Sequence, residues 1–573
     1  MTTLVILRFL GIFAAYMGVT LALPALMFRR ILRGRSLAEQ FLMCYTFGNF
    51  YIINIVFLLQ LLHISNFFTL AGLTAVLSIV IGGRVNRIPL KQQAGNTWHL
   101  FGKLLRGRMK LKSAIFLFLG KCAAGIKRLA KFFYRHIVKN PIQSMLLLGI
   151  GVCLCWIYGR QIILVYGYRA SDIPVHMSWI NEMSRGKIFA KGVYPFGFHC
   201  MIYYLHAVFR FDTYVILCQF FFAQVIFMHL VLLAMLKQLC KTKYIPYIGT
   251  FVFLLGNFWS GQTYSRFYAT LPQEFGMIFV IPSIYFLIRF FQIPKQKLAD
   301  KETRLTLQCF AMAFSLTLAI HFYGTMIAGL CCIGIACGFC FRFLRKEYFC
   351  RIMFTGICSV FLAVLPMGIA FATGTPLQGS LGWGLSVING GKSSSSTETE
   401  AETDEAETLE VSTGDDKNTV RVVKPDGTVM EIDVSDLPSA QENESGGQTQ
   451  TETTVPAVPK VSFGEKIRKI PGKAKNALSE MSSRILEFII KLDVKNIGYM
   501  ILASFALLLL LGFIFCVFRQ PGYGAMLMSM GFCMWIVTIL LCAGVFGLPP
   551  LMDGARCSIY YVYLLSAALT ALA

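Results

Sequence analysis

The sequence predicts an all-α polytopic membrane protein with about thirteen transmembrane helices. Its 573 residues are 56% hydrophobic, and the mean hydropathy is +0.63. Only 14% of the residues are charged, whereas a soluble domain usually has about 25%. Apolar runs close to the ~20 residues that cross a bilayer recur along most of the chain.

These runs define the expected spans in chain order. Three precede a long basic segment, seven form a central group, and three follow an acidic segment. The expected spans are 3–28, 39–64, 67–83, 143–166, 213–236, 244–259, 273–293, 305–321, 324–342, 352–372, 498–518, 524–545 and 557–573.

The distribution of basic residues predicts the orientation. Residues 84–142 contain 14 Lys and Arg and no Asp or Glu, and shorter basic clusters lie between other spans. Basic connectors face the cytoplasm in membrane proteins. Alternation of the spans then places the N-terminus and the segments 167–212, 260–272, 373–497 and 546–556 outside. The apolar, Lys-studded stretch within 84–142 is expected to form amphipathic helices on the inner surface.

The net charge of +24 is better explained by lipid than by nucleic acid. No nucleic-acid recognition motif accompanies the charge, and the clusters lie where anionic head groups would meet them. The expected partner is therefore membrane lipid, with no nucleic acid. The expected location is the plasma membrane, as an integral multi-pass protein.

These features divide the chain into five segments. They are N-terminal transmembrane helices (1–83), a basic cytoplasmic amphipathic segment (84–142), a transmembrane core with an outer loop at 167–212 (143–372), an extracytoplasmic insertion with amphipathic helices (373–497), and C-terminal transmembrane helices (498–573). An amphipathic interfacial or re-entrant helix is also expected near 196–209, which is too short to cross.

The insertion differs in composition from the rest of the chain. Sixteen of the 29 acidic residues lie between Glu398 and Glu452, largely in a low-complexity tract at 393–452. Such a tract is typical of a disordered, solvated spacer. Within it, "TVRVVKPDGTVMEIDV" alternates apolar and polar residues around Pro-Asp-Gly, which predicts one β-hairpin.

Asp172 and His176 are the candidate catalytic residues. Before Asp172 the chain has a single acidic side chain, Glu39. Asp172 and His176 stand four residues apart in "SDIPVHM", so on a helix they share a face. A carboxylate beside an imidazole suits a general base or a metal ligand. The alternatives are an N-cap at Ser171 or Asp172 and an interfacial histidine satisfied by the backbone.

Candidate substrate-binding residues lie in and before the same loop. The turn "GVYPFGFH" holds Tyr194 and His199, and its aromatic residues could instead only anchor the loop at the interface. Arg160 lies inside the fourth span near its outer end. There it would snorkel outward or meet a lipid phosphate.

Further candidates come from other outer segments. "YSRFYATLPQEFG" places Arg266 and Glu274 at the entry of a span. An unpaired carboxylate there is costly, so Glu274 is expected to have a partner, either Arg266 or a metal. His321 falls at the outer end of a span, and Arg556 follows Asp553 in "LMDGARCSIYY", where the pair could be only a local salt bridge.

The outer loop carries a resemblance to a known superfamily. "SDIPVHMSWINEMSRGKIFAKGVYPFGFHCMIYY" is similar to the Asp…His…Tyr-Pro-x-Gly-x-His loop of bacterial membrane proteins that resemble the GT-C polytopic glycosyltransferases. The resemblance covers roughly 143–372, with weaker support at 498–573. It implies an inverting enzyme at the extracytoplasmic face that moves a sugar from a polyprenyl-phosphate donor to an acceptor hydroxyl, in the assembly of a cell-envelope glycan or glycoconjugate.

The resemblance also implies roles for residues. Asp172 matches the loop acid, which deprotonates the acceptor or holds a divalent metal such as Mg²⁺ or Mn²⁺. Arg and His side chains would bind the donor phosphate, and here Arg266, His321 and Arg556 are candidates by their expected side of the membrane and their charge. The chain departs from the superfamily in three ways: the loop has no Asp-Glu or Asp-x-Asp pair, three spans precede the core, and the acidic insertion has no counterpart.

Three other functions compete with this interpretation. A transporter of a lipid-linked or small polar substrate predicts ionisable groups or broken helices near mid-membrane and paired repeats, of which the sequence shows little. An O-antigen polymerase-like enzyme would also face outward, with a different loop plan. A non-catalytic scaffold would use the outer polar residues only for structure.

Overall fold

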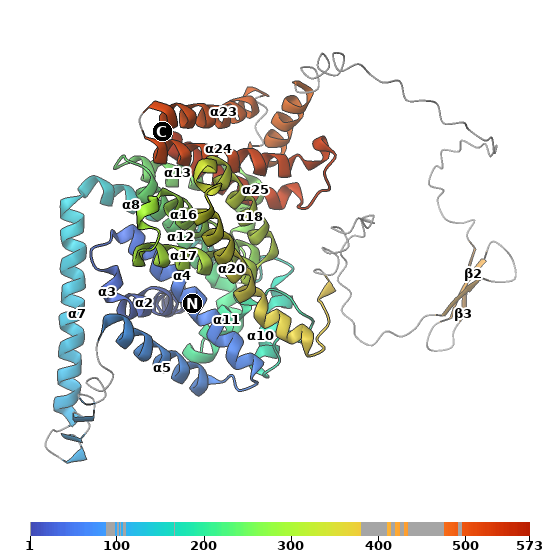
Figure 1. Cartoon of the computed structure of the whole chain (residues 1–573). Helices are drawn as coiled ribbons and strands as arrows, with labels where there is room; N and C mark the ends of the chain where they lie inside the picture. The colour runs from blue at the N-terminus through green and yellow to red at the C-terminus, as the bar shows by residue number, and fades with distance from the viewer. Residues whose placement is uncertain are drawn as a thin grey trace, which may run out of the picture. The chain divides into compact units, whose positions relative to one another are not determined.

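The computed structural model describes residues 2–87, 95, 98–99, 102–103, 105–106, 111–165, 167–379, 410–413, 419–423, 429–433, 475–490, 495–518 and 520–573. The chain divides into a larger unit, Met1–Asn389 with Pro471–Ala573, and a smaller unit, Gly390–Ile470. The larger unit is a bundle of helices (Figure 1). The candidate site residues all belong to it.

The expected polytopic architecture is confirmed. In the described part of the chain, eleven helical segments are long and apolar enough to cross a membrane. The runs expected at 244–259 and 324–342 form shorter apolar helices, Ile245–Phe258 and Phe322–Gly338. The eleven segments are Thr2–Met27, Leu37–Leu61, Phe67–Asn86, Pro141–Leu164, Thr213–Leu239, Pro272–Gln292, Lys301–Ile320, Lys346–Ala372, Asn496–Phe518, Pro521–Leu541 and Gly554–Leu572.

Several of these segments are interrupted, so the individual helices are more numerous. The N-terminal helices are α1 (Thr2–Met17), α2 (Leu23–Met27), α3 (Arg29–Leu32), α4 (Leu37–Leu61), α5 (Phe67–Asn86) and α7 (Leu111–Lys139). The core helices are α8 (Pro141–Leu154), α9 (Gln161–Leu164), α10 (Ile173–Ser184), α11 (Gly197–Phe209), α12 (Thr213–Leu239), α13 (Ile245–Trp259), α14 (Gly261–Arg266), α15 (Pro272–Met277), α16 (Val280–Gln292), α17 (Lys301–Ile320), α18 (Phe322–Gly338), α19 (Cys340–Phe343) and α20 (Lys346–Ala372). The C-terminal helices are α23 (Lys495–Phe518), α24 (Pro521–Leu541) and α25 (Gly554–Leu572).

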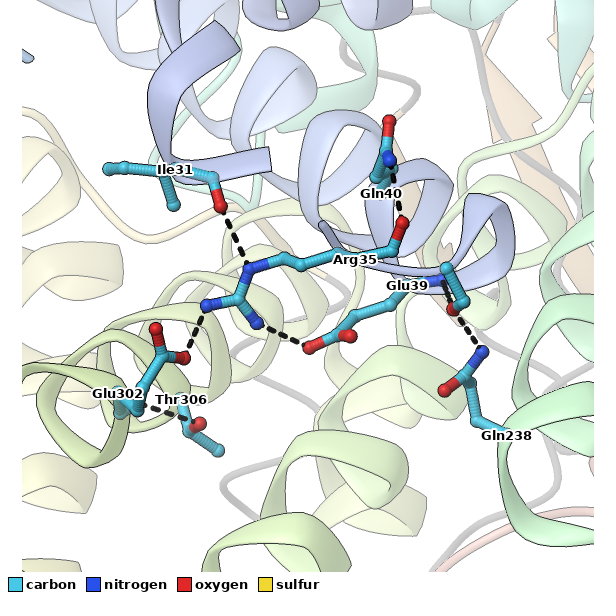
Figure 2. A network of polar contacts seen from close by, with 8 residues as sticks. Ile31, Arg35, Glu39, Gln40, Gln238, Glu302 and Thr306 are labelled. Atoms are coloured by element: carbon cyan, nitrogen blue, oxygen red, sulfur yellow. Dashed lines mark hydrogen bonds and ion pairs between the residues drawn. The ribbon is translucent and has the colours of Figure 1, made fainter. Parts of the chain in front are cut away.

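The basic connectors meet at one end of the bundle, here called the basic end. Arg35, between α3 and α4, forms ion pairs with Glu39 of α4 and Glu302 of α17 (Figure 2). Gln238 at the end of α12 donates to Ser36 Oγ. Lys295, after α16, pairs with Glu347 at the start of α20. The connectors that the charge pattern assigns to one side therefore lie together.

The outer loop lies at the opposite end, here called the loop end. Gln60 Nε2, at the end of α4, donates to the Met183 carbonyl over 2.8 Å. His63 Nδ1 lies 2.9 Å from the Gly186 carbonyl oxygen. Val193 forms a parallel bridge with Leu377, which follows α20. The segment 167–212 is thus fixed against the ends of α4 and α20, far from the basic connectors.

The helix expected near 196–209 is more enclosed than the sequence suggests. We expected an interfacial or re-entrant helix, but α11 is almost entirely buried and packs against α4, α5, α10 and α12. Gly197 also allows α11 to approach α17 closely, because a Cβ there would lie 2.7 Å from the Ala319 carbonyl oxygen. Apolar side chains cover most of α11, so the bundle buries them instead of leaving one face to lipid.

The amphipathic helices expected in the flanking segments are present in part. Most of 84–110 lies outside the described residues, and α7 follows as one long helix with exposed apolar side chains such as Phe116 and Leu119. An exposed apolar face with lysines suits a helix at a membrane surface. In the returning segment, residues 475–485 are α-helical and continue into a π-helical turn at Leu486–Ile490.

The smaller unit contains three short strands. They are β1 (Glu410–Thr413), β2 (Thr419–Val423) and β3 (Val429–Asp433), two of which are labelled in Figure 1. They form an antiparallel sheet in the order β1-β2-β3. In its register, Arg421 of β2 stands opposite Ser412 of β1 and Glu431 of β3. The low-complexity tract on either side of these strands lies outside the described residues.

Candidate functional site

Asp172 presents a free carboxylate at the start of α10. It stands at the N-cap position of α10, with Pro174 in the first turn, but its side chain makes no capping hydrogen bond. Its Oδ1 accepts a hydrogen bond from Ser171 Oγ over 3.0 Å, and the side chain is exposed. The helix-cap interpretation therefore lacks the bond that defines a cap.

His176 and His199 form a buried pair beneath Asp172. His199 Nε2 lies 3.1 Å from His176 Nδ1, and the side chains are 0% and 8% exposed, respectively. Burial lowers the pKa of His176 to about 4, although the Asp172 carboxylate opposes that shift. Burial, and then His176, lower the pKa of His199 well below its ordinary value. Both rings are neutral at pH 7, so one N–H donates to the lone pair of the other.

Aromatic rings enclose this pair. The Trp179 ring lies 5.6 Å from His176 and 5.2 Å from His199, measured between centroids. Phe196 stacks on Trp179 and approaches His199 to 4.5 Å. The "GVYPFGFH" turn thus forms one wall of the histidine pair, and Tyr194 from the same turn lies 5.5 Å from Trp179.

Arg266 and Glu274 form an ion pair. We expected Glu274 to have a partner because an unpaired buried carboxylate is costly. Arg266 Nε lies 2.6 Å from Glu274 Oε1, and the Glu274 side chain is 2% exposed. The charge of Glu274 raises the pKa of Arg266, and Asp172 adds to that effect. Glu274 Oε2 has no hydrogen-bond partner among the described residues. The contribution of Asp172 places its carboxylate within electrostatic reach of Arg266.

His321, Tyr323 and Arg556 add the third side of the site. His321 is the N-cap of α18, where its Nδ1 accepts from the Tyr323 N–H over 3.2 Å. Arg556, at the start of α25, lies over the Tyr323 ring at 5.5 Å. The Tyr194 and His321 rings are 6.4 Å apart. Burial, followed by the charges of Arg556 and Arg266, lowers the pKa of His321 to about 3.

The charges of Arg556 and Asp172 also affect the pKa of the Tyr194 hydroxyl. Burial raises the pKa of Tyr194 to about 12, Arg556 opposes this shift, and Tyr323 and Asp172 add to it. Residues from four separate segments therefore share one electrostatic environment at the loop end. We call this set the loop-end cluster; its members are Asp172, His176, Tyr194, His199, Arg266, Glu274, His321, Tyr323 and Arg556.

Arg160 is the candidate that the structure does not bring into the cluster. Its guanidinium lies 5.1 Å from the centroid of the Trp156 ring, and Trp156 is 68% exposed. No contact with the cluster is recorded for it in the described ranges. This environment suits an arginine that reaches toward the membrane interface.

Tyr323 is the member that sequence reasoning missed. It follows His321 directly in "HFYG", so an aromatic residue next to a candidate phosphate-binding histidine was the available signal. Tyr560 is a second missed neighbour: it lies one turn after Arg556 on α25, is fully buried, and acts electrostatically on Arg266. Helical spacing from Arg556 could have suggested it.

The described residues do not build a protein-only metal site. No group of three His, Cys, Asp or Glu side chains among them is arranged to hold an ion. Of the two candidate ligands, Glu274 is already bound to Arg266, and the Asp172 carboxylate accepts a hydrogen bond from Ser171 with no second carboxylate recorded beside it among the described residues. The residues present do not fit a resident Mg²⁺ or Mn²⁺, and no step below depends on one.

Comparison of the chain with models of known protein families, with curated proteins and with solved structures finds no match. Four cavities of the described bundle lie apart from the cluster. They lie at the basic end, along α17 and α20, between α8, α12 and α13, and beside the start of α25. None of the four is lined by Asp172 or His176.

Proposed function

We propose that the protein is an inverting glycosyltransferase that moves a sugar from a polyprenyl-phosphate donor to an acceptor hydroxyl at the extracytoplasmic face. The observation that carries the proposal is the position of Asp172, whose exposed carboxylate lies close enough to Arg266 to affect its pKa. The charges of both Asp172 and Arg556 also affect the pKa of the Tyr194 hydroxyl. The similarity of the outer loop to GT-C-like proteins points to the same chemistry.

The proposed reaction needs a base and a cationic site for the leaving group. Asp172 takes the proton of the acceptor hydroxyl as its oxygen attacks the anomeric carbon of the donor. The bond from that carbon to the phosphate oxygen breaks, and the polyprenyl phosphate leaves with the electron pair. Attack opposite to the leaving group inverts the anomeric configuration.

Arg556 is the best-placed group for the phosphate. It has no acidic partner among the described residues and lies against Tyr323 only through its cation–π contact. Arg266 is the second cation, although Glu274 neutralises part of its charge. Fixed cations that face developing negative charge stabilise a transition state without reorganisation. The neutral imidazole of His321 can add a hydrogen bond to the same oxygens.

His176 and His199 are assigned a positioning role. They are neutral and hydrogen-bonded to each other, and His176 lies one helical turn after Asp172 on α10. The pair and its aromatic wall fix the start of α10, and with it the position of the carboxylate. Neither imidazole is needed to accept the proton in this scheme.

Transport is the competing function, and the distribution of charge favours transfer over it. Each ion pair of the described residues joins residues of connectors, of shorter helices or of the first turn of a span, as with Arg35–Glu302 and Arg266–Glu274. A transporter would place such groups near mid-membrane. A polymerase-like enzyme at the same face would still require the base and cations assigned here.

The deciding experiment measures release of polyprenyl phosphate from labelled polyprenyl-phosphate sugars by the full chain in nanodiscs. Wild-type protein is expected to release it in the presence of a suitable acceptor fraction, whereas Asp172→Asn is not. Glu182→Gln is the matched control, because Glu182 lies on α10 as well and pairs only with Arg185. Equal release by wild type and Asp172→Asn would remove Asp172 from the mechanism.

A further inference from the structure

A charged cavity lies at the basic end, remote from the loop-end cluster. It has a volume of about 280 Å³ and lies between the start of α4, the end of α16 and the start of α17. We call it the basic-end pocket. The charged residues that line it are Arg35, Glu39, Arg289, Lys297, Asp300 and Glu302, and Tyr285 adds a hydroxyl.

One wall of the pocket is a closed ion-pair network. Arg35 is held between Glu39 and Glu302, and its Nε also donates to the Ile31 carbonyl over 3.0 Å (Figure 2). Its pKa is raised by these carboxylates against the effect of burial. With one cation shared by two carboxylates, this wall carries an excess of one negative charge.

Three further groups of the pocket, Tyr285, Arg289 and Lys297, have no side-chain partner among the described residues. The Tyr285 side chain is 1% exposed, and its hydroxyl makes no hydrogen bond among the described residues. Arg289 follows Tyr285 by one turn on α16, and no acidic partner is recorded for it or for Lys297 in the described ranges. A buried hydroxyl without a partner costs free energy, so its position in a cavity beside two cations points to a ligand.

The charges of the pocket define the ligand. Its cations are Arg35, Arg289 and Lys297, and its carboxylates are Glu39, Asp300 and Glu302, so the net charge is zero. The unpaired cations lie at the end of α16 and in the following connector, whereas the excess negative charge lies at the starts of α4 and α17. A ligand with separated positive and negative groups complements this arrangement.

We propose that the basic-end pocket binds the head group of an ethanolamine phospholipid. The phosphate lies against Arg289, Lys297 and the Tyr285 hydroxyl, and the ammonium lies against Asp300 and Glu302. A primary ammonium donates three hydrogen bonds, which a carboxylate wall can accept.

A lipid is the favoured source of this head group. The pocket lies where the spanning segments Leu37–Leu61, Pro272–Gln292 and Lys301–Ile320 end, which is the level of lipid head groups. Its lining also includes Met43, Phe286 and Leu305, which can contact the apolar part of a lipid. Pockets between transmembrane helices bind lipid head groups, and basic ones take anionic head groups. The zero net charge of this pocket favours a zwitterionic head group instead.

Native mass spectrometry of the full chain with defined lipids tests the proposal. Wild type is expected to retain dioleoyl phosphatidylethanolamine about tenfold more strongly than dioleoyl phosphatidylglycerol. Arg289→Ala with Lys297→Ala should weaken ethanolamine-lipid binding about tenfold, and Tyr285→Phe about threefold, because each removes a hydrogen bond to a charged group. Lys295→Ala is the matched control: it removes a neighbouring cation that pairs with Glu347 outside the pocket.

Two outcomes would overturn the proposal: phosphatidylglycerol binding as tight as phosphatidylethanolamine binding, or unchanged lipid binding by the double variant. A competition arm identifies the source of the head group. If an equal concentration of free O-phosphoethanolamine displaces the lipid, the pocket recognises the head group and its ligand is the soluble phosphate ester. Persistence of the bound lipid would assign the pocket to the membrane.

Discussion

His199 Nε2 lies 3.1 Å from His176 Nδ1, and the pair is buried behind the exposed carboxylate of Asp172. The contact joins α11 to α10 and links the "GVYPFGFH" turn to the start of the outer loop. It makes the loop a fixed element of the bundle. The proposed base is therefore held by buried packing although its own side chain is open to solvent.

The first prediction concerns Asp172. Asp172→Asn should lower transfer about 10²- to 10⁴-fold, because it removes the general base while keeping the size of the side chain. The melting temperature should change little, since the carboxylate is exposed and makes no cap bond. Glu182→Gln should retain activity. A large loss of thermal stability in Asp172→Asn would show a structural role instead.

The second prediction concerns pH. The folded protein holds His176 with a pKa of about 4, whereas an unfolded histidine titrates near 6.5. Stability is therefore complete above about pH 6.5 and falls as the pH drops toward 4, because the unfolded chain binds the extra proton. The shift of His176 alone corresponds to about 3 kcal/mol. Thermal unfolding in detergent at pH 7.5, 6, 5 and 4 measures the effect.

A variant separates the histidine pair from other acid-sensitive groups. His176→Gln should reduce the slope of stability against pH between 6.5 and 4, because glutamine does not titrate. His63→Gln is a matched control, since His63 is exposed at the same end of the bundle. An unchanged slope in His176→Gln would mean that other groups dominate the acid response.

The third prediction concerns the Arg266–Glu274 pair. Arg266→Ala should destabilise the protein by about 3–5 kcal/mol, because it leaves a carboxylate that is 2% exposed without its cation. Adding Glu274→Gln should restore part of that loss, since the uncompensated charge is removed. Unfolding free energies of both single variants and the double variant give the coupling. Additive losses would argue against a direct pair.

The fourth prediction concerns Arg556. Arg556→Ala should weaken binding of a polyprenyl-phosphate donor about tenfold with little change in melting temperature, because Arg556 contacts Tyr323 but no carboxylate among the described residues. Arg556→Lys should keep part of the affinity through its charge. Binding is measured with a fluorescent polyprenyl phosphate. Arg185→Ala, which removes an exposed cation from the same end, is the control.

The positions of the helices could be predicted from the sequence because hydropathy and charge are local properties of each segment. The apolar runs correspond to described helices, including the shorter α13 and α18. The cost of a buried carboxylate was enough to anticipate the pairing of Glu274 with Arg266. The burial of α11 within the bundle was not anticipated, since an apolar helix of 13 residues looks the same in sequence whether bilayer or protein covers it.

By itself, the sequence determined that this chain is a polytopic helical protein with basic connectors grouped apart from the polar segment 167–212. Hydropathy and charge are properties of short segments, so they can be read before folding. Only the tertiary structure decided that His176 meets His199, that Arg556 covers Tyr323, and that Arg35 joins Glu39 to Glu302. These contacts depend on the rotation and depth at which separate helices pack, which no local pattern specifies.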